Sequence, residues 1–416
     1  MREITIPLCC ICFLISGCRN QNSQEYRKIS DIGGVVLTEN EIVESDQVYF
    51  LDFEKHLRNT KKDTFTINSI SRDISFIPLE TTDDALLSTE NFKLAKFNER
   101  YYISWSLDRV IKNIMEFDST GQFIDILIKR GQGPQELPMI VFWSLNRNAQ
   151  LLYASTFNEV IFYSFENATK NKYVFENSSG NSSFHGCLLS DGTFVDLPTW
   201  HGEGNSNTPY INFRNQAGEI IHSIYYPQKR DIAHDITESG SSVSVSSYNL
   251  CPTYTGDALF RDMFNDTIYR IRSMDDINPY IIIYNGSFTP VLEDAPNQTT
   301  RVRKMYLEKI LDTNNNFFVS YSYRNEKYTA IWDKRLKSFI SNIKSDNSDE
   351  QRIVSNNFNS YGFTRYRTPK GKEILIPILN YYDGNLYSVL NASEAMEFLP
   401  GIVSEDNPVL MIITIG

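Results

Sequence analysis

The stretch Ile114-Met115-Glu116-Phe117, followed at once by Asp118-Ser119-Thr120-Gly121, has the form of a short apolar strand that runs into a tight turn. Segments of this form recur along the chain, at 161–165, 210–213, 268–271, 329–332 and 386–389. Their last residues are 117, 165, 213, 271, 332 and 389, so the steps are 48, 48, 58, 61 and 57 residues. A second series of short apolar strands precedes these segments, at 101–103, 151–153, 193–195, 258–260, 317–319 and 374–376.

Two parallel series of six members predict a six-bladed β-propeller, an all-β fold in which each blade is a four-stranded antiparallel sheet. Each blade buries both faces against its neighbours, which agrees with the 24 Tyr and 26 Phe among the 416 residues. A β-sandwich with coincidental spacing is the alternative. The period exceeds the usual ~40–50 residues, so long loops are expected at 177–183, 200–207 and 231–247.

The end of the chain indicates how the ring closes. Residues 409–415 form an apolar strand that would promote aggregation if it stayed unpaired. We expect it to pair inside the last blade, with residues 64–79 helping to close the circle. The longest helical candidate is the isolated segment 300–311.

The charge balance excludes one class of partner. Lys plus Arg number 40 and Asp plus Glu number 51, which gives a net charge of −11. A nucleic-acid-binding protein needs a basic face, so no nucleic-acid partner is expected.

The N-terminus reads MREITIPLCCICFLISGC over residues 1–18. The apolar stretch 4–15 has the length of a signal-peptide core and is too short to span a membrane. Ile15-Ser16-Gly17-Cys18 resembles the lipobox of bacterial lipoproteins, in which the Cys is lipidated after cleavage. The alternative is an ordinary secretory signal in which Cys18 is incidental.

These features predict a signal peptide at 1–17, a lipidated polar tether at 18–46 and a propeller at 47–416. Acyl chains on Cys18 would anchor the protein to a membrane, at about 0.8 kcal/mol per buried CH₂. Arg19 favours the outer membrane under the sorting rule of diderm bacteria, because an Asp at this position would favour retention in the inner membrane. The chain is expected to be a monomeric envelope protein, facing either the periplasm or the cell surface.

Two cysteines remain in the predicted propeller. Cys187 and Cys251 are expected on the innermost strands of consecutive blades, three and four. Export permits a disulfide, but such strands usually stand too far apart for one. We therefore expect two reduced, buried thiols.

No stretch of the sequence carries a recognisable catalytic constellation, and no catalytic residue, metal site or cofactor is predicted. His185 is a candidate ligand-binding residue facing the channel, although a satisfied core histidine is the simpler interpretation. Trp200, His201 and Glu203 could bind a sugar by stacking and hydrogen bonding, or could belong to a solvated loop.

Several motifs together resemble a known family. They are residues 77–84 (IPLETTDD), 117–123 (FDSTGQF), 130–136 (RGQGPQE) and 265–271 (NDTIYRI). In this order, and with the lipobox, they resemble the six-bladed, NHL-like propeller lipoproteins of Bacteroidota. The resemblance implies the fold and an envelope location, and it implies no catalytic residue. Ser119 and Thr267 lie in motifs similar to the O-glycosylation sites of exported Bacteroidota proteins.

The favoured function is a lipid-anchored binding module for an envelope protein or a glycan. The alternative is a hydrolase or lyase that depends on a metal in the channel, as in some NHL-like propellers. A structural lipoprotein within a larger envelope assembly is a third interpretation.

Overall fold

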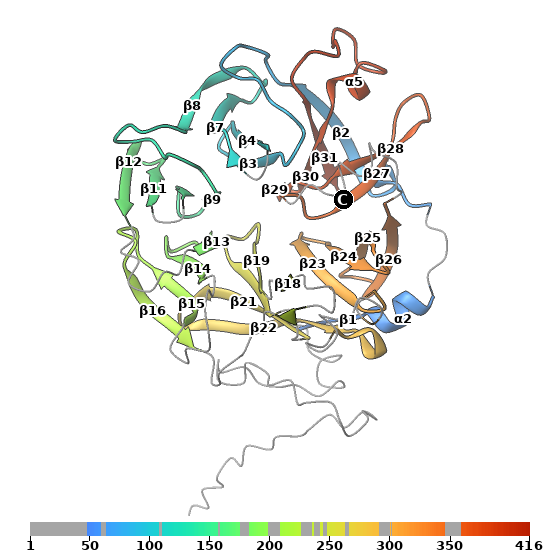
Figure 1. The fold of residues 1–416 in the computed structure, drawn as a ribbon. Helices are drawn as coiled ribbons and strands as arrows, with labels where there is room; N and C mark the ends of the chain where they lie inside the picture. Colours follow the sequence, from blue (N-terminus) through green and yellow to red (C-terminus); the bar gives the residue numbers. More distant parts are fainter. Residues whose placement is uncertain are drawn as a thin grey trace, which may run out of the picture.

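The computed structural model describes residues 48–59, 64–107, 110–156, 159–174, 183–198, 209–225, 235–236, 242–243, 248–262, 266–290, 300, 302–345 and 359–416. Six sheets are arranged around a central axis, as Figure 1 shows. This arrangement confirms the predicted six-bladed β-propeller.

Blades one to five each contain four antiparallel strands that follow one another outward in chain order, and the first strand of each blade lies nearest the axis. Blade one contains β3 (Lys93–Phe97), β4 (Arg100–Ser104), β7 (Asn113–Asp118) and β8 (Phe123–Lys129). Blade two contains β9 (Phe142–Asn146), β10 (Leu151–Ser155), β11 (Glu159–Ser164) and β12 (Thr169–Val174), and blade three contains β13 (Ser183–Leu188), β14 (Phe194–Pro198), β15 (Pro209–Arg214) and β16 (Ile220–Tyr225). Blade four contains β19 (Tyr248–Pro252), β20 (Ala258–Asp262), β21 (Thr267–Ser273) and β22 (Asp276–Tyr284), and blade five contains β23 (Met305–Asp312), β24 (Asn316–Tyr323), β25 (Glu326–Asp333) and β26 (Ser338–Lys344).

Blade six closes the ring with strands from both ends of the chain. Its order from the axis is β29 (Asn380–Tyr382), β30 (Asn385–Leu390), β31 (Val409–Ile415) and β2 (Ser71–Pro78). Strand β2 pairs antiparallel with β31. The apolar C-terminal strand is therefore covered on both edges, which confirms the predicted closure.

Additional elements surround the blades. Strand β1 (Tyr49–Asp52) joins the outer edge of blade four, parallel to β22, and leads into α2 (Phe53–Arg58). The 3₁₀ turn η1 (Ile67–Ser69) precedes β2, and η2 (Gly286–Phe288) follows β22. The described residues also form two-stranded sheets, which pair β5 (Ser106–Leu107) with β6 (Val110–Ile111), β17 (Asp235–Ile236) with β18 (Ser242–Val243), and β27 (Phe363–Arg367) with β28 (Glu373–Pro377). A short helix, α5 (Ala392–Ala395), follows β30.

The two series of repeated segments occupy equivalent strands in five blades. In blades one to five the segments lie on the second and third strands. In blade six the predicted register is wrong by one strand. Segment 374–376 lies on β28, in the extra hairpin before blade six, and segment 386–389 lies on the second strand, β30. The inserted hairpin has the same apolar pattern as a blade strand, so spacing alone could not separate them.

The predicted helix at 300–311 is also wrong, because residues 305–312 form strand β23. The segment contains good helix formers, but it supplies the innermost strand of blade five, where Met305 and Ile310 are buried. Tertiary packing overrides local helix propensity at this position.

Each blade presents two ends, because successive strands run in opposite directions. The turns between first and second strands lie at one end, which we call the turn face: 98–99, 147–150, 189–193, 253–257, 313–315 and 383–384. The connections between blades, and those between second and third strands, lie at the opposite end, which we call the loop face. Parts of the predicted long loops at 177–183, 200–207 and 231–247 lie outside the described residues.

Cys187 and Cys251 lie on β13 and β19, the inner strands of blades three and four, as predicted. Both are buried and neither forms a disulfide. Burial raises the pKa of each thiol, so both are neutral at physiological pH.

Candidate functional site

The turn face is held together by contacts that cross the propeller axis. The Arg147 guanidinium of blade two donates a 2.8 Å hydrogen bond to the Asp383 carboxylate of blade six. It also lies 5.4 Å from the centre of the Tyr382 ring. In blade four, the Tyr254 ring meets the Tyr381 ring of blade six edge to face at 5.3 Å. Blades two, four and six are not neighbours, so these contacts link alternate blades.

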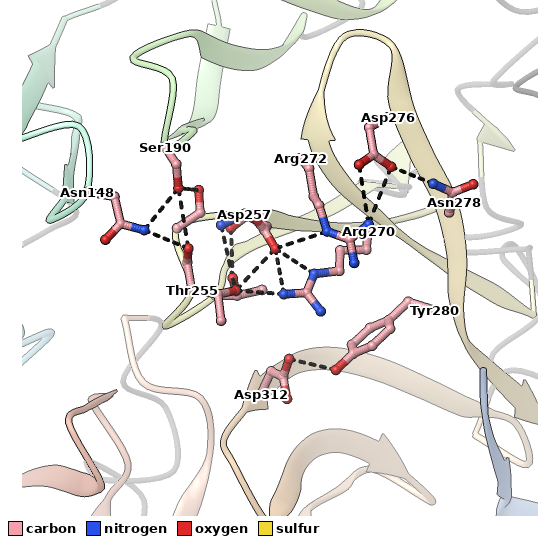
Figure 2. Close-up of polar contacts among 12 residues, drawn as sticks. Asn148, Ser190, Thr255, Asp257, Arg270, Arg272, Asp276, Asn278, Tyr280 and Asp312 are labelled. Atoms are coloured by element: carbon pink, nitrogen blue, oxygen red, sulfur yellow. Dashed lines mark hydrogen bonds and ion pairs between the residues drawn. The ribbon is translucent and has the colours of Figure 1, made fainter. Parts of the chain in front are cut away.

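A second set of polar contacts joins the turns of blades two, three and four, and Figure 2 shows part of it. Asn148 Nδ2 donates to Thr255 O at 2.9 Å and to Ser190 Oγ at 3.2 Å. Asn146 Nδ2 donates to Leu188 O at 2.8 Å and to Gly256 O at 3.0 Å. Two side-chain amides of blade two thus reach backbone carbonyl groups in blades three and four.

The charged groups of blade four on this side form a compensated network (Figure 2). Arg270 Nε donates to Asp257 Oδ2 at 2.6 Å, and Arg270 Nη2 donates to Thr255 Oγ1 at 2.8 Å. Arg272 Nε lies 3.8 Å from the same Asp257 oxygen. Burial opposes the charge on Arg270, but Asp257 raises the pKa of the guanidinium above its ordinary value.

The network continues into blade five through Tyr280. Tyr280 Oη donates to Asp312 Oδ2 at 3.0 Å, and Lys334 Nζ donates to Asp312 Oδ1 at 2.5 Å. Burial raises the pKa of Asp312, while Lys334 and Tyr280 oppose the shift. Because each of these charges has an opposite partner, we interpret the turn face as a structural closure of the axis.

Two lysines lie on inner strands above this closure. Lys93, the first residue of β3 in blade one, donates through Nζ to the Trp143 carbonyl of blade two. Its ammonium lies 4.2 Å from the centre of the Phe142 ring and 4.9 Å from that of Trp143. Burial, with a smaller contribution from Lys309, lowers the pKa of Lys93 to about 7.

Lys309 belongs to β23 in blade five, and its ammonium lies 5.6 Å from the centre of the Tyr361 ring. Burial lowers the pKa of Lys309 as well. Lys309 also contributes to the lowered pKa of Lys93, although the two residues belong to blades five and one. Cys187 in blade three opposes the shift of the Lys93 pKa, and Cys251 in blade four and Glu308 oppose that of the Lys309 pKa. These four side chains, with Tyr361 and Tyr382, form what we call the axis cluster.

The loop face over blades six and one carries two connected loops, 79–92 and 391–408. Asn407 joins them: its Nδ2 donates to Glu80 O at 2.7 Å, and its Oδ1 accepts from Leu87 N at 2.8 Å. Leu86, Met396 and Val403 project from these loops with 56%, 48% and 53% of their surface exposed. The loop face therefore presents apolar side chains on hydrogen-bonded loops.

The residues proposed from the sequence do not meet in one described site. His185 lies on β13, the inner strand of blade three, as expected for a residue near the channel. Trp200, His201, Glu203 and Cys18 lie outside the described residues.

The two proposed glycosylation positions differ in exposure. Ser119 is exposed in the turn after β7. Thr267 is only 6% exposed at the start of β21, and its hydroxyl donates to the Asp266 carboxylate at 3.1 Å. Glycosylation of Thr267 would therefore have to precede folding, whereas Ser119 is accessible in the folded chain.

Lys93, Lys309 and Arg147 were not singled out from the sequence. Each is a single basic residue at a strand or turn without a motif around it. Only the register of the inner strands shows that Lys93 and Lys309 approach the axis.

Within the described part of the chain, no group of three or more His, Cys, Asp or Glu side chains is placed to hold a metal ion. No helix among the same residues is long and apolar enough to cross a membrane.

The fold and these contacts define the protein as a six-bladed β-propeller in which alternate blades are linked at the turn face. The chain belongs to the family described as "Domain of unknown function (DUF4934)", whose model matches residues 36–414. No curated protein matches the chain.

Solved structures with this fold include two Bacteroides proteins. One, from Bacteroides fragilis NCTC 9343 and named as exported, is 16% identical, with a TM-score of 0.61 over 89% of this chain and 99% of the other. The other, a DUF4221 family member from Bacteroides vulgatus ATCC 8482, is 10% identical, with a TM-score of 0.49 over 83% and 97% of the two chains. Virginiamycin B lyase from Staphylococcus aureus is 9% identical, with a TM-score of 0.42 over 83% and 100%. At these identities the similarity concerns the fold alone.

Proposed function

We propose that this protein is a lipid-anchored envelope propeller that binds a protein or glycan partner through its loop face. The two joined loops over blades six and one carry this proposal. Asn407 links loops 79–92 and 391–408, and these loops expose Leu86, Met396 and Val403. Several exposed apolar residues on one pair of joined loops are typical of an interaction surface. The turns at the other end of the blades are tied together across the axis by contacts such as Arg147–Asp383.

Location outside the cytoplasm is supported by the N-terminal sequence and by the B. fragilis protein of the same fold, which is named as exported. Cys18→Ala tests the anchor. We expect the variant to move from the membrane fraction to the soluble fraction, whereas unchanged membrane fractionation would contradict lipid anchoring at Cys18.

In-cell crosslinking of two variants tests partner binding. Leu86→Asp changes the loop face. Leu336→Asp changes the turn between β25 and β26, the third and fourth strands of blade five, which lies at the same end of the blade as the turn face; Leu336 has the same 56% exposure. A crosslinked complex should form with the wild type and with Leu336→Asp, but not with Leu86→Asp. Equal loss in both variants, or loss only in Leu336→Asp, would contradict binding through the loop face.

A further inference from the structure

The two joined loops of the loop face combine exposed apolar side chains with charge of one sign. Neither loop contains a lysine or an arginine. Their acidic residues are Glu80, Asp83, Asp84 and Glu90 in loop 79–92, and Glu394, Glu397, Glu405 and Asp406 in loop 391–408. Each exposed apolar residue has an acid within two positions in the sequence: Leu86 has Asp84, Met396 has Glu397, and Val403 has Glu405.

Half of these carboxylates are used inside the protein. They accept from Phe123 N (Glu80), Asn391 N (Glu394), Lys372 Nζ (Glu397) and Val403 N (Asp406). The other four are exposed and form no ion pair with any residue that the structure describes; they are Asp83, Asp84, Glu90 and Glu405. The surface therefore offers carboxylates whose charge is not neutralised by a neighbouring base.

Hydrogen bonds hold the two loops together as one surface. Asn407 N donates to Thr81 Oγ1 at 2.8 Å, and Thr89 Oγ1 donates to Asn391 Oδ1 at 2.6 Å. In blade one, Trp105 Nε1 donates to Leu86 O at 3.0 Å, which ties loop 79–92 to the propeller. Because the loops are already fixed to each other, a partner can bind without first ordering them, which lowers the cost of binding.

The charge of this surface determines which partner it fits. Exposed carboxylates attract basic side chains and repel acidic ones, so they select the sign of the partner. Leu86, Met396 and Val403 favour apolar side chains opposite them. A neutral glycan lacks the positive charge, and the surface of an anionic membrane would be repelled.

We propose that the loop face binds a polypeptide segment that carries both Lys or Arg and aliphatic side chains. This inference rests on the proposed function, because it specifies the class of partner for the same surface. The partner's basic groups lie against the four exposed carboxylates, and its aliphatic groups lie against Leu86, Met396 and Val403.

Fluorescence anisotropy with three labelled peptides of equal length tests the proposal, using the full chain carrying Cys18→Ala. The first peptide contains Lys, Leu and Gly; the second has Glu in place of each Lys, and the third has Ser in place of each Leu. We expect the Lys–Leu peptide to bind, the other two to bind at least about tenfold more weakly, and added salt to weaken binding. Absence of binding by the Lys–Leu peptide, or equal binding by either of the other two, would overturn the inference.

Matched charge variants locate the binding site. Asp84→Asn/Glu405→Gln should weaken binding of the Lys–Leu peptide by about threefold to tenfold. Asp275→Asn/Glu166→Gln is the control, because it removes the same charges at exposed positions in outer turns at the other end of the blades. Equal affinity of the two double variants would show that net charge attracts the peptide, and would overturn the inference.

Crosslinking in cells separates this inference from the proposed function. The complex formed by the wild type should be lost in Asp84→Lys/Glu405→Lys, as in Leu86→Asp. A complex that depends on Leu86 but survives this charge reversal would retain binding through the loop face and reject a basic partner. Binding of maltoheptaose, a neutral glycan, in place of the Lys–Leu peptide would have the same meaning. A complex that does not depend on Leu86 would reject the proposed function itself.

Discussion

The guanidinium of Arg147 and the carboxylate of Asp383 are separated by 236 positions in the sequence and by 2.8 Å in the structure. They belong to the corresponding turns of blades two and six. Blade one lies between these blades in the ring, so the ion pair spans its inner edge. With the Tyr254–Tyr381 contact, it links three alternate blades at the turn face.

A double-mutant cycle on Arg147→Ala and Asp383→Ala should give a coupling free energy of about 0.5–1 kcal/mol in urea unfolding, because the pair is partly exposed. Arg147 lowers the pKa of Asp383 below its ordinary value. The unfolded carboxylate therefore protonates first as pH falls, and the contribution is present above about pH 4 and lost below it. A coupling free energy of zero at neutral pH would show that the pair does not stabilise the closed face.

Gly256 should be intolerant of a side chain. Its φ is +84°, and an added Cβ would lie 2.3 Å from Ser190 Oγ and 2.9 Å from Asn148 Nδ2. Gly256→Ala should lower the free energy of unfolding by roughly 2–4 kcal/mol, through backbone strain and overpacking together.

Gly371→Ala is the matched control for Gly256→Ala. Gly371 has the same φ of +84°, but nothing lies within 4 Å of an added Cβ. It should show only the cost of backbone strain, about 1 kcal/mol. Equal losses in the two variants would indicate that the crowding between blades three and four has no energetic role.

Strand β2 should be required for a soluble fold. A chain beginning at residue 80 lacks β2 and exposes an edge of β31, where Met411 and Ile413 are buried in the full chain. We expect it to aggregate on refolding, while a chain beginning at residue 48, which keeps β1, α2 and β2, remains soluble. Light scattering measures both, and a soluble, monomeric chain from residue 80 would contradict closure by β2.

Lys93 should make stability depend on pH in the alkaline range. Its pKa is about 7 in the folded protein against 10.5 as the ordinary value. Between these values the unfolded state binds more protons, so the free energy of unfolding should rise with pH, by up to about 1.4 kcal/mol per unit.

Lys93→Met should lack this rise, and its stability relative to the wild type should be highest below pH 7. Lys372→Met, at an exposed position, should follow the wild-type curve. Parallel curves for wild type and Lys93→Met from pH 7 to 10 would show that Lys93 keeps an ordinary pKa. Denaturant midpoints across this range provide the measurement.

Most of the fold could be predicted from the sequence, because each blade repeats the same short apolar strands. Segments such as 151–153 and 161–165 have a period that predicts a radial repeat, and the apolar strand 409–415 required a partner. The register of blade six could not be predicted, since β27 and β28 share the blade pattern without being part of a four-stranded sheet. Segment 300–311 has helical residue preferences that packing near the axis overrides.

The candidate site was largely beyond sequence reasoning. Lys93 and Lys309 are 216 positions apart, and nothing around either residue distinguishes it from a surface lysine. Their location near the axis follows from the ring, which brings the inner strands of separate blades together. Motif-based candidates such as Trp200 and His201 remain predictions.

Maleimide labelling of single-cysteine variants in intact cells tests binding through the loop face most directly. Leu86→Cys and Leu336→Cys have equal exposure in the folded chain, and the native Cys187 and Cys251 are buried. In purified protein both new cysteines should react at similar rates. In cells, a bound partner should slow labelling at position 86 and leave position 336 unchanged. Equal labelling at the two positions in cells, or protection only at position 336, would contradict binding of a partner through the loop face.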